Sequence, residues 1–268
     1  MSSVGLLYVG AVLCVNGLVL IGLVRPRGAT VLNFLVGALQ VVFPTILLIE
    51  ADGDPAAVLA ASGLYLFGFT YLWVGAINTF DLPAEGFGWF SLYVAIAAVV
   101  FGGAAIALQA DPVSAAMWWL WAALWFLFFL LDGLGHTWLR VPIGWFAIFC
   151  GVGTCTAPAL LQLLGLYAPS PAAGAALGLA GITVLVLALL LGRRSLRARR
   201  IETEAELTGD PEAAVARPVS ASATAPSQPD AESGTMRSSG TSSGSGRTVA
   251  DSPEPGSTEI AARIITRG

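Results

Sequence analysis

Seven stretches of about twenty apolar residues follow one another from the N-terminus to Gly192. A helix needs roughly 20 mostly apolar residues to cross the hydrocarbon core of a bilayer. Short breaks rich in Pro, Gly and Asp separate the stretches, such as "EADGDP" and "DLPAEG". The sequence therefore predicts seven membrane spans, at Val4–Val24, Ala29–Ile49, Ala56–Phe80, Gly88–Gln109, Ser114–Leu134, Pro142–Leu164 and Ala172–Gly192.

The composition agrees with a protein that lies in lipid. Of the 268 residues, 56% are hydrophobic and 11% are charged, whereas about a quarter of a soluble domain is charged. The fold class predicted is all-α: a polytopic membrane helix bundle with a disordered tail. A single His and three scattered Cys give no metal cluster, no nucleophile–base pair is visible, and nothing indicates a cofactor or a nucleic-acid partner. We therefore do not expect an enzyme.

The basic residues predict which way the bundle faces. All 13 are arginines. Within the membrane part they follow spans one, five and seven, at Arg25, Arg27, Arg140 and five positions between Arg193 and Arg200. Arginine and lysine favour cytoplasmic loops. The pattern predicts an outside N-terminus and a cytoplasmic C-terminus.

The chain divides into three expected parts. Residues 1–167 hold six spans, 168–192 add a seventh, and 193–268 form a cytoplasmic tail. From about Ile201 the tail is rich in Ser, Thr, Gly, Pro, Ala and Glu, as in "ESGTMRSSGTSSGSGRT". Such a sequence has too little apolar surface to fold, so the tail is expected to be disordered.

Two spans carry stripes of aromatic and polar residues at helical spacing. In span three the stripe is Phe67, Tyr71, Val74 and Asn78. In span five it is Trp118, Trp121 and Trp125, with Leu124 beside it. Residues three and four apart share one helix face, and buried indole N–H groups need partners. The stripes fit the lining of a narrow passage, but interface belts and ordinary helix contacts also use Trp and Tyr.

Other polar residues of the spans have architectural interpretations. Asp132 is the only charged residue well inside a span, and His136 lies one turn later on the same face. A carboxylate in the membrane is a functional candidate, but Gly133 and Gly135 suggest that the helix ends there and that both groups are solvated. The amides of Asn16, Asn33 and Gln40 are expected to cross-link helices.

Small residues have similarly plain roles. The thiols of Cys14, Cys150 and Cys155 are interpreted as buried packing groups. Gly174 and Gly178 form a GxxxG pair in span seven and predict a packing face there.

Six ordered stretches resemble the family of urea channels and amide transporters of bacterial inner membranes. They are "LLYVGAVLCVNG" from Leu6, "NFLVGAL" from Asn33, "LFGFTYLWVGAIN" from Leu66, "WFSLYVAI" from Trp89, "WLWAALWFL" from Trp119 and "VPIGWF" from Val141. The resemblance covers roughly Val4 to Leu164, which is six spans. It implies a six-helix protomer with its own pore, placed in a bacterial inner membrane and usually assembled as a hexamer.

The resemblance also implies a pore lining of aromatic and leucine side chains. The matching positions are Leu6, Leu13, Phe67, Tyr71, Trp118, Trp121, Leu124 and Trp125, and Asn78 extends the stripe of span three. Two departures argue against gating by acid. The loops expected outside contain no His, and Cys150 stands where acid-gated members carry a carboxylate.

The expected function is a passive channel for urea or short-chain aliphatic amides. An ion-coupled amide transporter is the first alternative, although coupling needs ionisable groups near the midplane. A membrane anchor that presents its tail to a partner is the second, and a cytoplasmic amidase or urease is the candidate partner. A retinal protein is excluded because the chain has no lysine for a Schiff base.

Overall fold

The computed structural model describes residues 2–208, and the rest of the expected tail, 209–268, lies outside the described residues. The described chain consists of helices joined by short breaks, without strands, so the predicted fold class is confirmed. Seven helical segments are long and apolar enough to cross a membrane, as the sequence predicts. Large apolar side chains such as Leu35, Ile96 and Leu179 lie exposed on them, which suits a surface in contact with lipid.

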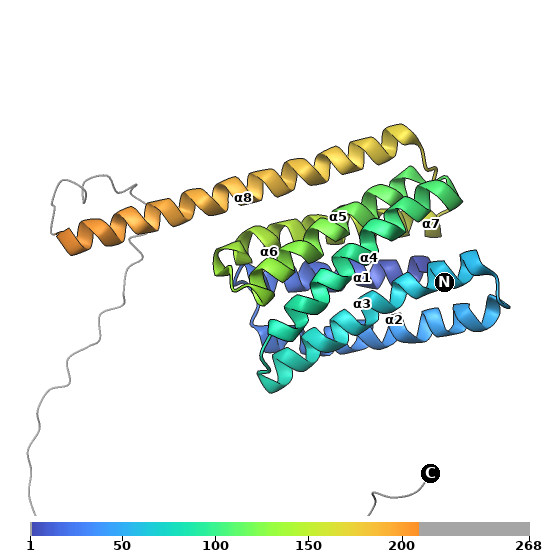
Figure 1. Ribbon diagram of the computed structural model, residues 1–268, viewed down its shortest axis with the longest axis horizontal. Helices are drawn as coiled ribbons and strands as arrows, with labels where there is room; N and C mark the ends of the chain where they lie inside the picture. Colours follow the sequence, from blue (N-terminus) through green and yellow to red (C-terminus); the bar gives the residue numbers. More distant parts are fainter. Residues whose placement is uncertain (1, 209–268) are drawn as a thin grey trace, which may run out of the picture. The chain divides into compact units, whose positions relative to one another are not determined.

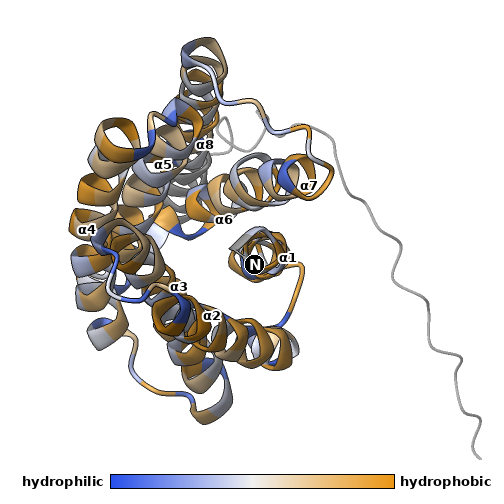
Figure 2. Ribbon diagram, turned by 90° about the vertical axis from the view of Figure 1, so that its right-hand side faces the viewer, coloured by the Kyte–Doolittle hydropathy of each residue, from blue (hydrophilic) through white to orange (hydrophobic). Residues whose placement is uncertain are grey.

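The helices run back and forth along the bundle (Figure 1). Their bounds are α1 Ser2–Leu20, α2 Thr30–Glu50, α3 Pro55–Phe80, α4 Glu85–Gln109, α5 Pro112–Phe128, α6 Arg140–Phe149, α7 Ala157–Leu163 and α8 Pro171–Thr208. Viewed along the helix axes, α1 lies within an arc formed by the other helices (Figure 2).

Two spans change helical type partway across. Span five ends in a π-helical turn, Phe129–Gly133. Span six comprises α6, a π-helical segment at Cys150–Thr156, and α7. Pro158 has no N–H to donate to a regular hydrogen-bond ladder. One turn of the π-helical segment also carries a side-chain bond, from the Thr156 hydroxyl to the Gly151 carbonyl at 2.9 Å. Such π-helical segments often occur at functional sites.

Glycines let α1 approach span six closely. A Cβ at Gly10 would lie 2.7 Å from the carbonyl oxygen of Gly151, and one at Gly17 would lie 2.7 Å from that of Gly144. A real side chain would not fit at either position, because Cβ atoms essentially never come within 3.0 Å of another heavy atom. The pairs of glycines therefore hold α1 and span six in backbone contact, as in other membrane helix pairs.

The seventh span, α8, packs along α5 and α6 (Figure 1). A Cβ at Gly174 would lie 2.5 Å from the Pro112 carbonyl oxygen, and Gly181 faces Leu120. Nothing lies within 4 Å of a Cβ at Gly178. The packing face predicted from the GxxxG pair is therefore only half right: its second glycine is Gly181, two turns from Gly174. The helix also continues past Gly192 to Thr208, so Gly192 is not a helix end.

Polar contacts inside the bundle are few and specific. Asn16 and Asn33 donate to each other's side-chain oxygens at 2.9 and 2.8 Å, which confirms the predicted link between α1 and α2. The same prediction is wrong for Gln40, whose buried side-chain oxygen has no partner among the described residues.

The connection to α8 is tied to the start of α5. Asp111 caps α5 by accepting from the backbone N–H groups of Val113 and Ser114, and Tyr167 donates to its other oxygen at 2.8 Å. Burial, and then the hydrogen bond to Asp111, raise the pKa of Tyr167 well above its usual value.

Candidate functional site: two cavities joined by an aromatic column

A cavity of about 170 Å³ opens at the end of the bundle that carries the N-terminus; we call it the N-terminal cavity. Its walls come from α1 to α5 and α7. The lining residues used below are Leu6, Val9, Gln40, Phe67, Trp118 and Trp121. No charged side chain of the described chain lines it. The cavity can therefore admit a small neutral molecule and offers no charge to an ion.

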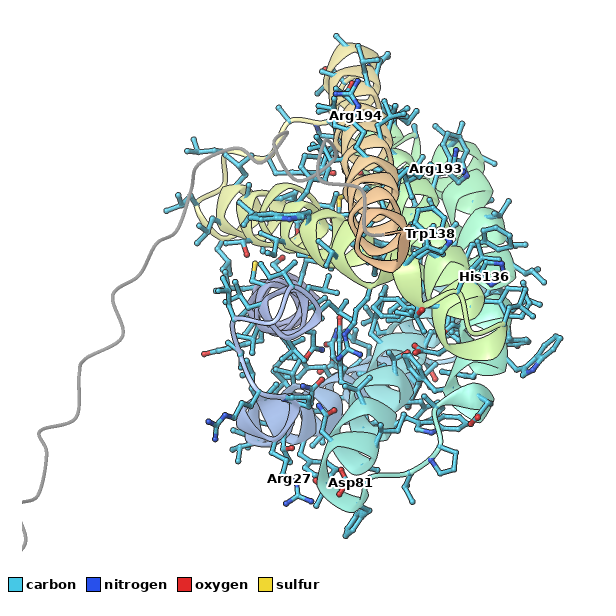
Figure 3. All side chains as sticks on the ribbon, turned by 90° about the vertical axis from the view of Figure 1, so that its left-hand side faces the viewer. Arg27, Asp81, His136, Trp138, Arg193 and Arg194 are labelled. Atoms are coloured by element: carbon cyan, nitrogen blue, oxygen red, sulfur yellow. The ribbon has the colours of Figure 1, made fainter. Side chains whose placement is uncertain are left out.

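A second cavity, of about 420 Å³, opens at the opposite end; we call it the arginine-end cavity. Asn16, Asn78, Asp132 and Arg140 line it. The same end carries an exposed ion pair between Arg27 and Asp81 at 2.6 Å, and Arg193 stacks on the Trp138 ring with its guanidinium carbon 5.4 Å from the ring centre (Figure 3). The two ends of the bundle thus differ in charge as the sequence predicts.

Four of the residues implied by the resemblance lie between the two cavities. They are Leu13, Tyr71, Leu124 and Trp125, exposed by 3%, 1%, 1% and 2%. Each lies on its helix between residues that line opposite cavities: Tyr71, for instance, follows Phe67 of the N-terminal cavity and precedes Val74 of the other. A closed layer of side chains therefore separates the cavities.

Aromatic rings form a continuous column through this layer. Ring centres are 5.0 Å apart for Trp118 and Trp121, and 5.0 Å for Trp121 and Phe67. The Phe67 and Trp125 centres are 6.4 Å apart, and Trp125 lies 5.4 Å from Phe128, which lines the arginine-end cavity. Two of these pairs are edge-to-face, an arrangement that aromatic rings favour, and two are tilted.

The polar groups of this layer fall into two kinds. The Trp121 indole N–H donates to the Thr154 hydroxyl at 2.8 Å, and that hydroxyl donates to the Cys150 carbonyl at 2.6 Å. The π-helical segment of span six thereby fixes the Trp121 ring. In contrast, the Tyr71 hydroxyl and the Trp125 indole N–H are buried with no partner among the described residues. Buried polar groups are nearly always hydrogen-bonded, so these two are the groups of the layer that a solute or water would satisfy once the layer opens.

The residues expected at the pore therefore occupy three levels. Leu6, Phe67, Trp118 and Trp121 line the N-terminal cavity, Asn78 lines the arginine-end cavity, and the other four lie in between.

Sequence reasoning missed several neighbours of these residues. Phe87 and Phe128 extend the column, but neither belongs to a periodic stripe that would single it out. Thr154 was missed because its role depends on a hydrogen bond to a residue 33 positions away. Gln40 was interpreted as a helix link, and its place in the N-terminal cavity could not be inferred from spacing.

Asp132 and His136 do not pair among the described residues. Asp132 is partly buried in the wall of the arginine-end cavity, whereas His136 is exposed beyond the end of the span (Figure 3). Cys150 and Cys155 are fully buried and Cys14 partly so, and all three are free thiols.

Comparison with known proteins identifies the family. Residues 1–166 match the model of the AmiS/UreI family of transporters. This chain belongs to the AmiS/UreI family. A transporter protein of Rhodococcus erythropolis, AmiS2, is 56% identical to it over 189 residues, which is 70% of this chain and 91% of the relative. A protein of Mycolicibacterium smegmatis named for the transport of amidate substrates is 52% identical over 194 residues, 72% of this chain and 91% of the relative.

More distant AmiS/UreI relatives have solved structures. The acid-activated urea channel of Helicobacter pylori strain J99 is 31% identical over 199 residues, 61% of this chain and 98% of the relative. The cryo-EM structure of the H. pylori urea channel in its closed state matches with a TM-score of 0.57 at 29% identity, covering 63% of this chain and all of that one. The crystal structure of that channel matches with a TM-score of 0.55 over the same shares. The chain is thus a multi-pass membrane protein of a transporter family.

Proposed function

We propose that this chain is a passive channel for urea or short-chain aliphatic amides, which cross the bundle along the aromatic column. One observation carries the proposal. In the layer between two cavities at opposite ends, the buried polar side-chain groups left unpartnered among the described residues are the Tyr71 hydroxyl and the Trp125 N–H. A solute that passes there can replace the hydrogen bonds that it loses on leaving water.

The chemistry of the column suits a flat, neutral solute. Urea and small amides are planar, and their faces can slide along the rings of Phe67 and Trp125. Their carbonyl oxygen can accept from the Trp125 N–H while an amide N–H donates to the Tyr71 oxygen. These contacts are few, so binding stays weak and conduction can be fast. An ion would find no charge there to offset the loss of its hydration.

Passive transport fits the distribution of charge better than ion coupling does. Coupled transporters place ionisable groups near the midplane. In the described spans, Asp132 is the candidate for such a group, and it lies in the wall of the arginine-end cavity rather than in the column. A membrane anchor remains the other alternative, with the tail as its functional part.

The remaining features of the proposal extend the family comparison. We place the protein in a bacterial inner membrane, with the N-terminal cavity outside and the arginine end in the cytoplasm. We expect a homo-oligomer, a hexamer by resemblance, in which each protomer has its own aromatic column. A cytoplasmic amidase or urease is a candidate partner that would consume the solute. Gating by acid is not expected, because the breaks at the N-terminal end contain no histidine.

Solute flux into proteoliposomes tests the function. Vesicles containing the purified protein are mixed with urea, acetamide or thiourea in a stopped-flow instrument, with and without a protonophore. We expect faster equilibration than in empty vesicles and no effect of the protonophore. A rate equal to that of empty vesicles contradicts the channel, and a rate that collapses with the protonophore favours the coupled transporter.

A further inference from the structure

Gln40 occupies an unusual position in the wall of the N-terminal cavity. It lies in the middle of α2, its side chain is 2% exposed, and its oxygen has no hydrogen-bond partner among the described residues. The nearby Gln162, which also lines the cavity, accepts from the Ser3 hydroxyl at 2.7 Å. A buried amide is costly unless it is hydrogen-bonded. The oxygen lies against Gly5, and a turn of this side chain, which lines the cavity, would bring it to a partner there.

The backbone around Gln40 is built to hold its side chain in place. A Cβ at Gly5 of α1 would lie 2.5 Å from the Gln40 side-chain oxygen, so this glycine leaves the room that the carboxamide occupies. A Cβ at Gly68 of α3 would lie 2.9 Å from the Gln40 carbonyl oxygen, so α3 fixes the backbone at the same residue. Two other helices thus accommodate Gln40 without satisfying its side chain.

We propose that the Gln40 carboxamide is the residue that selects primary amides and urea as they enter the aromatic column. A carboxamide presents an acceptor oxygen and a donor N–H side by side in one plane. A primary amide or urea presents the same pair, so the two groups can form two parallel hydrogen bonds. The inference rests on the proposed function, because it names the group that chooses the solutes of that same passage.

The cavity has the size and surroundings that this role needs. Its volume of about 170 Å³ is several times the roughly 30 Å³ that a water molecule occupies in the liquid. The rings of Phe67, Trp118 and Trp121 line the same cavity, so a solute paired with Gln40 is already beside the column. No charged side chain among the described residues competes for its amide group.

The pairing predicts discrimination between two isomers. Propionamide is a primary amide and carries an N–H on the same side as its carbonyl oxygen. N-methylacetamide has the same atoms, but as a trans secondary amide its N–H points away from the oxygen. It can therefore form only one of the two hydrogen bonds with Gln40. Because the isomers are equal in composition and nearly equal in volume, their ratio of fluxes reports the pairing rather than pore width.

The test measures both fluxes in proteoliposomes, after subtraction of the rates in empty vesicles. Gln40→Met keeps the length of the side chain and removes both hydrogen-bonding groups. We expect it to lower the propionamide to N-methylacetamide ratio about fivefold, the factor for one net hydrogen bond. Gly5→Ala, which displaces the carboxamide, should lower the ratio in the same direction. Thr45→Val is the control: it removes an exposed hydroxyl of α2 that bonds Tyr65 and lines neither cavity.

The outcomes separate this inference from the channel itself. An unchanged ratio in Gln40→Met with normal urea flux overturns the role of Gln40 and leaves the channel intact. If Gln40→Met does not insert, the ratio in Gly5→Ala decides in the same way. If the wild-type protein conducts no solute, the proposed channel function is wrong. Quenching of tryptophan fluorescence by the two isomers then tests whether Gln40 pairs with primary amides. Selective binding of propionamide that Gln40→Met abolishes then supports the pairing, and equal binding of the isomers overturns it.

Discussion

Removal of the Tyr71 hydroxyl should change solute flux and protein stability in opposite directions. The hydroxyl is buried in the layer between the cavities, with no partner among the described residues. When no solute is bound, this hydroxyl is a buried polar group without a hydrogen bond, so Tyr71→Phe removes a group that destabilises the fold. A structural tyrosine would lose a hydrogen bond on the same substitution and become less stable.

The sizes of both effects follow from the energetics of hydrogen bonds. An unsatisfied buried polar group costs about 1–3 kcal/mol, so we expect Tyr71→Phe to be as stable as the wild type or more stable, by up to about that amount. A solute in the column loses one hydrogen bond worth about 1 kcal/mol net. This raises its barrier and should slow urea flux about fivefold.

Thermal unfolding in detergent and stopped-flow flux in proteoliposomes measure the two effects on the same preparation. Tyr65→Phe is the matched control, because Tyr65 lies on the same helix and shares a 2.7 Å hydrogen bond with Thr45 outside both cavities. It should unfold at a slightly lower temperature and conduct normally. The reasoning is refuted if Tyr71→Phe lowers the unfolding temperature and leaves urea flux unchanged.

Three further predictions concern the column, pH and the tail. Trp125→Ala should still insert but be destabilised by about 3–5 kcal/mol, and it should pass thiourea faster relative to urea; an unchanged ratio in an inserted protein would show that Trp125 does not bound the passage. Urea flux should vary little between about pH 5 and 7.5, where an unperturbed histidine titrates, because the breaks at the N-terminal end contain no histidine; a steep rise in acid that Asp132→Asn abolishes would assign gating to that carboxylate. Truncation after Thr208 should leave flux within about twofold, and a cysteine at Ser239 should resist impermeant thiol reagents in intact cells; labelling from outside would contradict the seven-span orientation.

The sequence predicts the spans well because crossing a bilayer constrains length and polarity directly. It also predicts that Phe67, Tyr71 and Asn78 share one face of span three, since they repeat at helical spacing. The structure adds that these faces meet across the bundle, with Phe67 against Trp121 and Trp125. Helical periodicity tells which residues share a face, but not which faces come together.

Features that depend on contacts between distant residues could not be predicted. The π-helical segment of span six packs against α1 and α5, and its Thr154 accepts from Trp121; helical spacing reveals neither contact. Gln40 shows the limit most clearly. A lone amide in a span suggests a link between helices, as Asn16 and Asn33 confirm. Only the three-dimensional neighbours of Gln40 show that its side-chain oxygen has no partner among the described residues.

The most direct test of the central claim is a reversible block of the N-terminal cavity. Leu6 lines this cavity beside Phe67 and Trp118, and Leu6→Cys places a thiol there. The purified protein is labelled with a bulky cationic methanethiosulfonate before reconstitution, and the wild-type protein, whose three native thiols are buried or partly buried, is treated in parallel. We predict that labelling Leu6→Cys abolishes most of its urea flux, that reduction of the mixed disulfide restores it, and that the wild type is unaffected. A protein fully labelled at this position, by its mass, that conducts urea at the unlabelled rate would contradict a passage through the cavity and the aromatic column.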